Sequence, residues 1–256
     1  MKKILYSVFL VFIFVLFASV VYLSTIGLET SKFNELIISE IKKRDSKIDL
    51  NLEKIKIKLD IRKFQLFLST NTPKIIYQNI KVPITEVKIY SKINKILISK
   101  IEINQIIFDI EKFKIKDMQK AAIRIKPSNF KTYLLNNLDS GEVKKASFNL
   151  NIDENFKITD YKIRGSIKKI DVKIINNSMI KNLSFNFIVD NNLTLINSIN
   201  ANYKGVLVSN GSIDLQREEE IKINGKFNSK FDFKDKQINK LFSELKFLED
   251  KKIETK

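Results

Sequence analysis

The feature that most constrains this chain is an uncharged apolar run from Ile4 to Ile26, directly behind Lys2 and Lys3. At 1.5 Å per residue, a helix over this run covers the roughly 30 Å hydrocarbon core of a bilayer. A cleaved secretory signal is the alternative, but its apolar region usually has about 7 to 15 residues. The run therefore predicts an uncleaved transmembrane anchor over residues 4–26, with residues 1–3 as a cytoplasmic tail.

The segment after the anchor has apolar residues at helical spacing. Thr30 or Ser31 offers a helix cap, and Ile37 and Ile41 fall on one face of the helix that follows. We expect an amphipathic helix and linker over residues 27–47.

From Ile48 onward, apolar residues recur at every second position, which is typical of strands with one apolar and one polar face. The phase slips at Glu53 and Lys54, which predicts a bulge or a turn. Similar runs continue to residue 235, and a helical pattern near residues 127–138 interrupts them. The predicted fold is mainly β: a long antiparallel, curled β meander over residues 48–235, forming a groove or an open barrel, with a few short amphipathic helices.

The last part of the chain carries two weaker patterns. YKIRGSIKKIDVKI from Tyr161 and EIKINGKFNSKFDF from Glu220 share an apolar-x-Gly-x-apolar core. This echo indicates either repeated hairpin units or chance similarity in a meander rich in Lys and Ile. Residues 236–256 have the apolar spacing of an amphipathic helix followed by a tail.

The residue types present exclude most catalytic chemistry. The chain has no Cys and no His, so disulfides, thiol nucleophiles, Ser-His-Asp triads and His or Cys metal sites are excluded. Asp and Glu mostly alternate with apolar residues along strands, where a charge usually lies on a solvated face. We find no glycine-rich phosphate loop. We therefore expect no catalytic residues, no metal, no cofactor and no enzymatic activity.

The formal net charge of +17 suggests an anionic partner. Only five of the 46 basic residues are Arg, however, and bidentate phosphate and base recognition favours Arg. Lys is spread evenly along the strands, and an AT-rich coding bias explains its abundance together with that of Ile, Asn and Phe. We expect no nucleic-acid partner.

The order of these parts resembles the AsmA-like family. The resemblance rests on GLETSKFNELIISEI, on the meander from LNLEKIKIKLDI to KVPITEVKIYSKINKILISKIEINQIIFDI, on the central helix and on YKIRGSIKKIDVKI. It implies a chorein-like, repeating-β-groove architecture in the periplasm of a diderm bacterium, anchored in the inner membrane. It also implies a role in phospholipid movement toward the outer membrane. Well-known members of the family are considerably longer than this chain.

The continuous apolar face of such a meander must be covered by a second sheet, a helix or another apolar body. If the sheet curls into a trough, acyl chains can lie in it; the alternative is a closed sandwich or jelly roll. Alternation selects six candidate groove-lining residues: Ile55, Ile57, Leu59, Ile89, Ile101 and Ile103.

These patterns predict an inner-membrane-anchored periplasmic protein that binds or conducts phospholipid acyl chains and supports outer-membrane biogenesis. Envelope proteins at its far end are further expected partners. One alternative is an envelope assembly or scaffold protein that binds other proteins through a sheet edge or a terminal helix. The other is an LptC-like jelly roll that passes lipopolysaccharide.

Overall fold

The computed structural model describes residues 2–32, 34–44, 46–63, 65–91, 103–124, 127–155, 157–174, 178–217 and 220–230. These residues form two compact units. The first unit comprises Met1–Ile110 and Ser147–Tyr161, and the second comprises Glu111–Ala146 and Lys162–Lys256. The predicted helix and tail over 236–256 lie outside the described residues.

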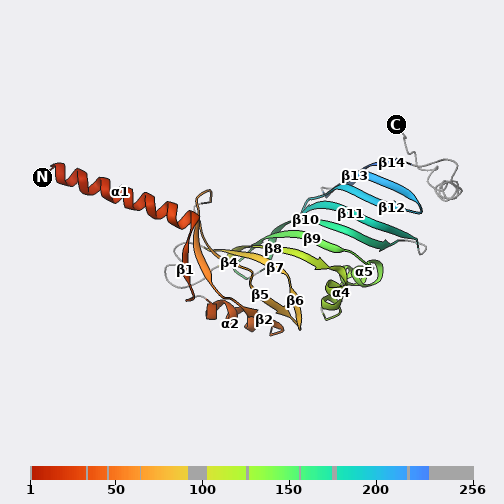
Figure 1. Ribbon diagram of the computed structural model, residues 1–256, viewed down its shortest axis with the longest axis horizontal. Coiled ribbons are helices and arrows are strands. Elements are labelled where there is room, and N and C mark those ends of the chain that lie inside the picture. Colours follow the sequence, from red (N-terminus) through yellow and green to blue (C-terminus); the bar gives the residue numbers. More distant parts are fainter. Residues whose placement is uncertain are drawn as a thin grey trace. The chain divides into compact units, whose positions relative to one another are not determined.

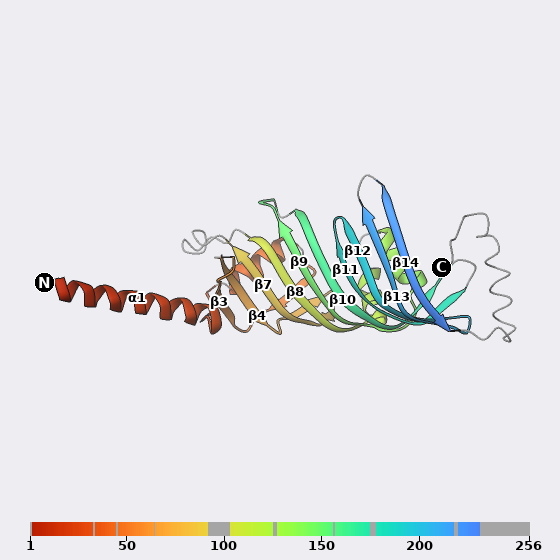
Figure 2. The same ribbon diagram turned by 90° about the horizontal axis from the view of Figure 1, so that it is seen from above.

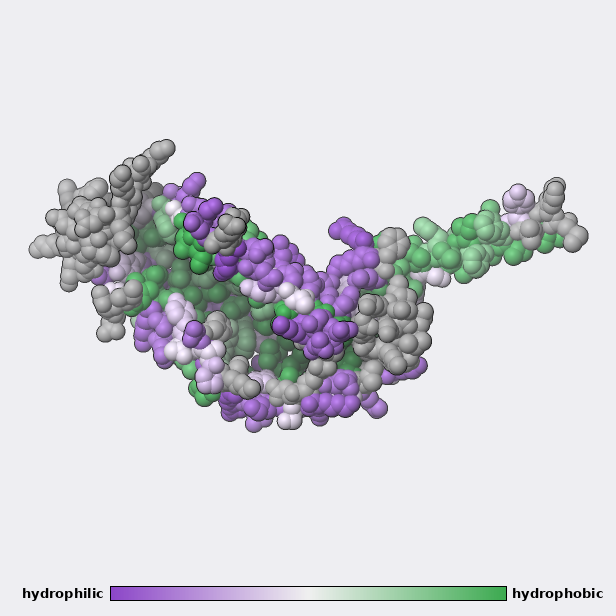
Figure 3. Space-filling model, turned by 180° about the vertical axis from the view of Figure 1, so that it is seen from behind, coloured by the Kyte–Doolittle hydropathy of each residue, from purple (hydrophilic) through white to green (hydrophobic). Residues whose placement is uncertain are grey.

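The chain begins with helix α1 (Lys2–Thr25), whose apolar side chains are exposed along its length. Its stretch Tyr6–Thr25 is long and apolar enough to cross a membrane, and none of it is buried against the protein. A signal sequence shares these properties. Figure 3 shows α1 as a hydrophobic rod.

The protein is mainly β, as the alternation predicts. The strands are β1 (Leu28–Thr30), β2 (Ile48–Asn51), β3 (Ile55–Asp60), β4 (Gln65–Asn71), β5 (Lys74–Tyr77), β6 (Ile80–Val82), β7 (Ile84–Ser91), β8 (Ile103–Lys114), β9 (Glu142–Ile152), β10 (Ile158–Lys173), β11 (Met179–Asp190), β12 (Leu193–Tyr203), β13 (Val206–Arg217) and β14 (Ile221–Lys230).

Eleven of these strands form one antiparallel sheet in the order β1-β3-β4-β7-β8-β9-β10-β11-β12-β13-β14, and β2-β5-β6 form a second, three-stranded sheet (Figure 1). From β7 to β14 each strand lies next to its neighbour in sequence, which is a meander and differs from the Greek-key order of a jelly roll. The described strands do not close into a barrel, because β1 and β14 stand at opposite ends of the order.

In the first unit, the small sheet and a helix pack on one face of the large sheet. Helix α2 (Asn34–Arg44), present where the sequence predicts it, contributes Ile37, and β2 contributes Leu50. These side chains pack against Ile55 of β3 and Leu68 of β4. The slip at Glu53 and Lys54 is therefore the crossing of the chain from the three-stranded sheet into the eleven-stranded one.

In the second unit, two short helices pack together on the sheet. Helix α5 (Asn129–Asn137) begins at the cap Ser128, whose Oγ accepts a hydrogen bond from the backbone N–H of Lys131 at 3.1 Å. Helix α4 (Ile115–Ile123) precedes it and is absent from the sequence prediction. Buried side chains of both helices, such as Ile115 and Leu134, form a core with Ile170 of β10.

The long strands of the second unit are bent by β-bulges. Four of them, β10 to β13, each contain a non-glycine residue with positive φ next to a shift of register: Lys169 (51°), Asn182 (53°), Ser198 (53°) and Asn210 (51°). An extra residue in a strand bends it and increases its twist. The strands accordingly curve along their length, as Figure 2 shows.

Substitution of Gly141 is expected to destabilise the second unit. Gly141 has a φ of 95°, and a Cβ there would lie 2.7 Å from the backbone N and Cα of the buried Ile170. Gly141→Ala should lower the free energy of unfolding by about 2 kcal/mol or more, measured by urea denaturation of the full chain in detergent. Gly205→Ala, in the exposed β12–β13 turn with a φ of 89°, tests backbone strain alone. Equal losses in the two variants would contradict the clash with Ile170.

Candidate functional site

The register of the strands assigns side chains to the two faces of the sheet, because cross-strand partners share a face. In the first unit one row consists of Leu28, Ile57, Leu68, Ile89 and Ile106. A row on the opposite face consists of Lys58, Phe67, Tyr90 and Gln105. The first unit therefore has one apolar face and one face with charged, amide and aromatic side chains.

The predicted groove residues that the structure describes all lie on this apolar face. Ile55 is only 2% exposed, and Ile57 and Ile89 pack against the core around it. Leu59 and Ile103 are half-buried. Ile101 lies outside the described residues. Three of the five described candidates therefore belong to a packed core beneath α2. Lipid binding by these residues stays a prediction.

A bulge in β8 aligns apolar residues on its two sides. Ile103 pairs with Ser91 and Ile106 with Ile89, and the register shifts between these two pairs. Without the shift, an odd spacing would put Ile103 and Ile106 on opposite faces. The bulge keeps both on the apolar face.

The apolar face of the first unit leaves only a small cavity. The cavity has a volume of ≈ 60 Å³ and is lined by side chains that include Ile37, Leu52, Ile75 and Val87. Its wall also includes Thr70, whose Oγ1 is buried and has no hydrogen-bond partner. In this measure one water molecule needs about 10 to 15 Å³, so the space holds a few water molecules and is too small for an acyl chain.

The second unit has a larger apolar face. One row across β10 to β14 consists of Ile163, Val189, Thr194, Leu215 and Ile223. The next row on the same face consists of Gly165, Phe187, Ile196, Ile213 and Gly225. The opposite face carries mostly charged and amide groups, such as Arg164, Asp214 and Asn224.

Helices α4 and α5 cover only part of this apolar face. Their core includes Ile170 and Val172 of β10 and takes in Leu183 of β11. On β14, by contrast, Ile223 is 64% exposed and Phe227 is 54% exposed. Figure 3 shows hydrophobic residues gathered in a hollow of this unit and bordered by hydrophilic ones. The described part of the second unit therefore presents apolar side chains that no other described element covers fully.

The glycines of the sequence echo occupy equivalent places on this face. Gly165 and Gly225 lie in the same cross-strand row, at its two ends. A Cβ at Gly165 would lie 2.9 Å from Cζ of Phe187, and one at Gly225 would lie 3.1 Å from Cε2 of Phe227. Each glycine thus makes room for a phenylalanine ring that lies on the sheet.

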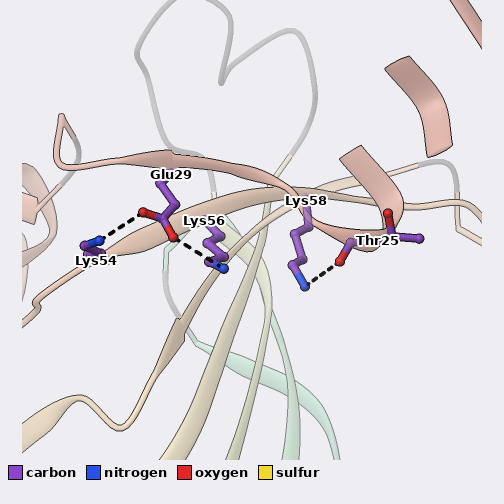
Figure 4. Close-up of polar contacts among 5 residues, drawn as sticks. All are labelled: Thr25, Glu29, Lys54, Lys56 and Lys58. Carbon is purple, nitrogen blue, oxygen red and sulfur yellow. Dashed lines mark hydrogen bonds and ion pairs between the residues drawn. The ribbon is translucent and has the colours of Figure 1, made fainter. Parts of the chain in front are cut away.

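The junction between α1 and the sheet is built from polar contacts (Figure 4). The Lys58 Nζ donates a hydrogen bond to the backbone O of Thr25, in the last turn of α1, at 3.2 Å. Glu29 forms ion pairs with Lys54 at 3.2 Å and with Lys56 at 3.4 Å. The hydrogen bond and the charge of Lys54, with those of Lys56, lower the pKa of the Glu29 carboxyl.

The charged face of the first unit carries a cluster around Tyr90. Tyr90 donates a hydrogen bond to Asp60 at 3.1 Å and stacks on Phe67, and Lys63 lies 4.1 Å above its ring. Burial, together with the negative charge of Asp60 and the hydrogen bond to it, raises the pKa of Tyr90 to about 12. Such a tyrosine stays protonated at neutral pH and can keep its hydrogen bond to Asp60 there. Among the described residues no three acidic side chains converge to hold a metal ion.

No known family model, curated protein or solved structure matches this chain.

Sequence reasoning could not predict how deeply each candidate residue is buried, because alternation does not assign partners to the strands. Alternation identifies the apolar face, but only the register shows that α2 covers Ile55 and that Ile223 stays exposed. A signal for α4 was present: Ile115, Met118 and Ala122 have helical spacing and all belong to its core.

Tyr90 is expected to make stability depend on alkaline pH. Its pKa is about 12 in the folded protein and about 10 in an unfolded chain, so its contribution is complete below about pH 10 and is lost as pH rises to about 12. Tyr90→Phe should lower the free energy of unfolding by about 1 kcal/mol at neutral pH, and the difference should shrink above pH 10. Urea midpoints across this range test it, with the exposed Tyr133→Phe as the control. Parallel curves for wild type and Tyr90→Phe would refute it.

Proposed function

We propose that this chain is a membrane-anchored protein that holds phospholipid acyl chains against the apolar face of its second unit, in the manner of the AsmA-like proteins. The observation that carries this proposal is the exposed apolar surface of β14, where Ile221, Ile223 and Phe227 all lie more than half exposed. Large uncovered apolar patches in soluble domains are usually binding surfaces.

The energetics of acyl chains fit this surface. Removing each methylene group from water contributes about 0.8 kcal/mol of favourable free energy. An acyl chain that lies on an apolar sheet therefore leaves a membrane at a much lower free-energy cost. The required interaction is non-directional, so alternating Ile, Leu and Phe side chains suffice. The polar opposite face, with residues such as Asn224 and Lys226, keeps the same strand soluble.

The apolar helix supports attachment of the protein to a membrane that contains the lipid. Helix α1 is exposed, apolar and long enough to cross a bilayer, and only Ile26 and Gly27 separate it from β1. In this proposal α1 crosses the inner membrane with its N-terminus in the cytoplasm, and the sheet lies in the periplasm and supports outer-membrane biogenesis. The proposal includes no nucleotide or other energy source, because the protein only shields the acyl chains from water.

A second candidate is binding of an envelope protein. The observation that favours it is that β14 pairs only with β13 among the described strands, so a strand of another protein can add to this edge. Lipid and protein binding differ in what co-purifies with the chain.

The proposal is tested by two substitutions at neighbouring positions of β14. Ile223→Arg puts a charge on the apolar face, and Asn224→Arg puts the same charge on the opposite face; both side chains are exposed, so neither substitution should unfold the protein. Phospholipid retained by the full chain after gentle detergent exchange is quantified by mass spectrometry. We expect Ile223→Arg to retain less than half as much lipid as wild type and Asn224→Arg to retain the wild-type amount.

Three outcomes would speak against lipid binding by this face. Equal retention in both variants would locate the lipid elsewhere, for example around α1, which both variants keep. Absence of lipid from the wild-type protein would refute the proposal. A stoichiometric protein partner without lipid would favour the edge of β14.

A further inference from the structure

A row of lysines lies beside the end of α1. Lys54 and Lys56 extend from the start of β3, and Lys58 follows two residues later on the same strand (Figure 4). Alternate residues of a strand lie on the same face, about 7 Å apart. The only acidic partner that this row has among the contacts of the described residues is Glu29, which leaves three positive charges against one negative charge.

The contact between Lys58 and α1 fixes the depth of Lys58, the member of this row nearest the helix, and Figure 1 shows β1, the partner of β3, running across the axis of α1. If α1 spans the bilayer, its apolar run ends at Ile26, where the hydrocarbon core gives way to headgroups. The headgroup layer is about 5 to 7 Å thick on each side. Because Lys58 Nζ is 3.2 Å from the backbone O of Thr25, its ammonium group lies in this layer.

The junction is also rigid. β1 begins two residues after α1 and pairs with β3 through Leu28, Glu29 and Thr30. Gly27 connects the two with a φ of 78°, and a Cβ there would lie 2.8 Å from the backbone O of Ile57. The lysine row therefore cannot swing away from the end of α1 on a flexible linker.

We propose that Lys54, Lys56 and Lys58 bind the headgroup phosphates of anionic phospholipids in the leaflet that contains the C-terminal end of α1. The proposal deepens the proposed function and rests on the part of it that places α1 across a membrane. It adds a headgroup site in the first unit to the acyl-chain site proposed for the second unit.

Charge and exposure favour this partner. Lys54 is mostly exposed, so its ammonium group can reach a phosphate while it stays close to Glu29. A lysine near an anionic membrane surface changes binding about fivefold. Glu29 competes with phosphate for the same two ammonium groups, so it limits the preference.

The experiment measures headgroup preference by native mass spectrometry of the full chain in detergent. Dioleoyl phosphatidylglycerol and dioleoyl phosphatidylcholine, which share their acyl chains, are titrated separately, and the ratio of their affinities is determined. We expect wild type to prefer phosphatidylglycerol and Lys54→Gln/Lys56→Gln to lower that ratio about fivefold, with Lys58 left in place to cap α1. Lys144→Gln/Lys226→Gln removes the same charge from exposed positions on other strands and should leave the ratio unchanged.

Glu29→Gln gives the sharpest test, because it should raise the ratio by releasing Lys54 and Lys56. A purely structural role of the ion pairs predicts no gain of phosphatidylglycerol binding in this variant. A ratio that stays at the wild-type value in both Glu29→Gln and Lys54→Gln/Lys56→Gln would overturn the proposal, as would an equal drop in the control pair.

Failure of the headgroup site and failure of the acyl-chain site give different results. The Ile223→Arg substitution should reduce total binding of both lipids and leave the preference for phosphatidylglycerol in place. Loss of the preference for phosphatidylglycerol, with normal total lipid binding, would show a change in the lysine row alone. Inorganic phosphate added as a competitor should have no effect, because the proposed ligand is a headgroup held at the membrane surface.

Discussion

The whole structure depends on one constraint: each antiparallel strand with alternating residues brings an apolar face that must be covered. In the first unit α2 and the three-stranded sheet provide the cover, and Ile55 is buried as a result. In the second unit α4 and α5 cover the sheet around Ile170, but the cover does not reach Ile223 and Phe227. The same pattern in sequence thus produces a closed core in one unit and an exposed apolar surface in the other.

The bulges keep that surface continuous while they bend the strands. Apolar residues three apart, such as Ile167 and Ile170 or Ile196 and Ile199, flank a register shift, and the extra residue returns both to one face. Polar side chains satisfy the disturbed backbone: the N–H of Lys169 donates to Ser184 Oγ at 2.9 Å. Asn182 and Asn210 suit two of these bulges, because Asn tolerates a positive φ better than most residues.

Much of the fold could be predicted from sequence, because period-two alternation and an apolar run are local signals. The α1 helix, the meander and the helices after Thr30 and Ser128 follow from such signals. Strand partners depend on contacts distant in sequence, so nothing local shows that β2 joins a separate sheet or that Ile57 packs under α2. Alternation therefore places the described candidate residues of the first unit on one apolar face, whereas their burial there and the exposed surface at Phe227 required the three-dimensional structure.

The junction between α1 and the sheet fixes how the first unit is held to its apolar helix. A helix joined to a domain by a flexible linker would leave the domain free to turn away from the bilayer. Here Gly27 permits a turn directly into β1, and pairing of β1 with β3 ties the direction of α1 to that of the first unit. The hydrogen bond from Lys58 to Thr25 adds a second tie and satisfies a carbonyl that the helix end leaves free. If α1 spans a bilayer, as proposed, a sheet held in this way begins at the membrane surface, where a protein that receives lipid directly from a leaflet needs its first strand.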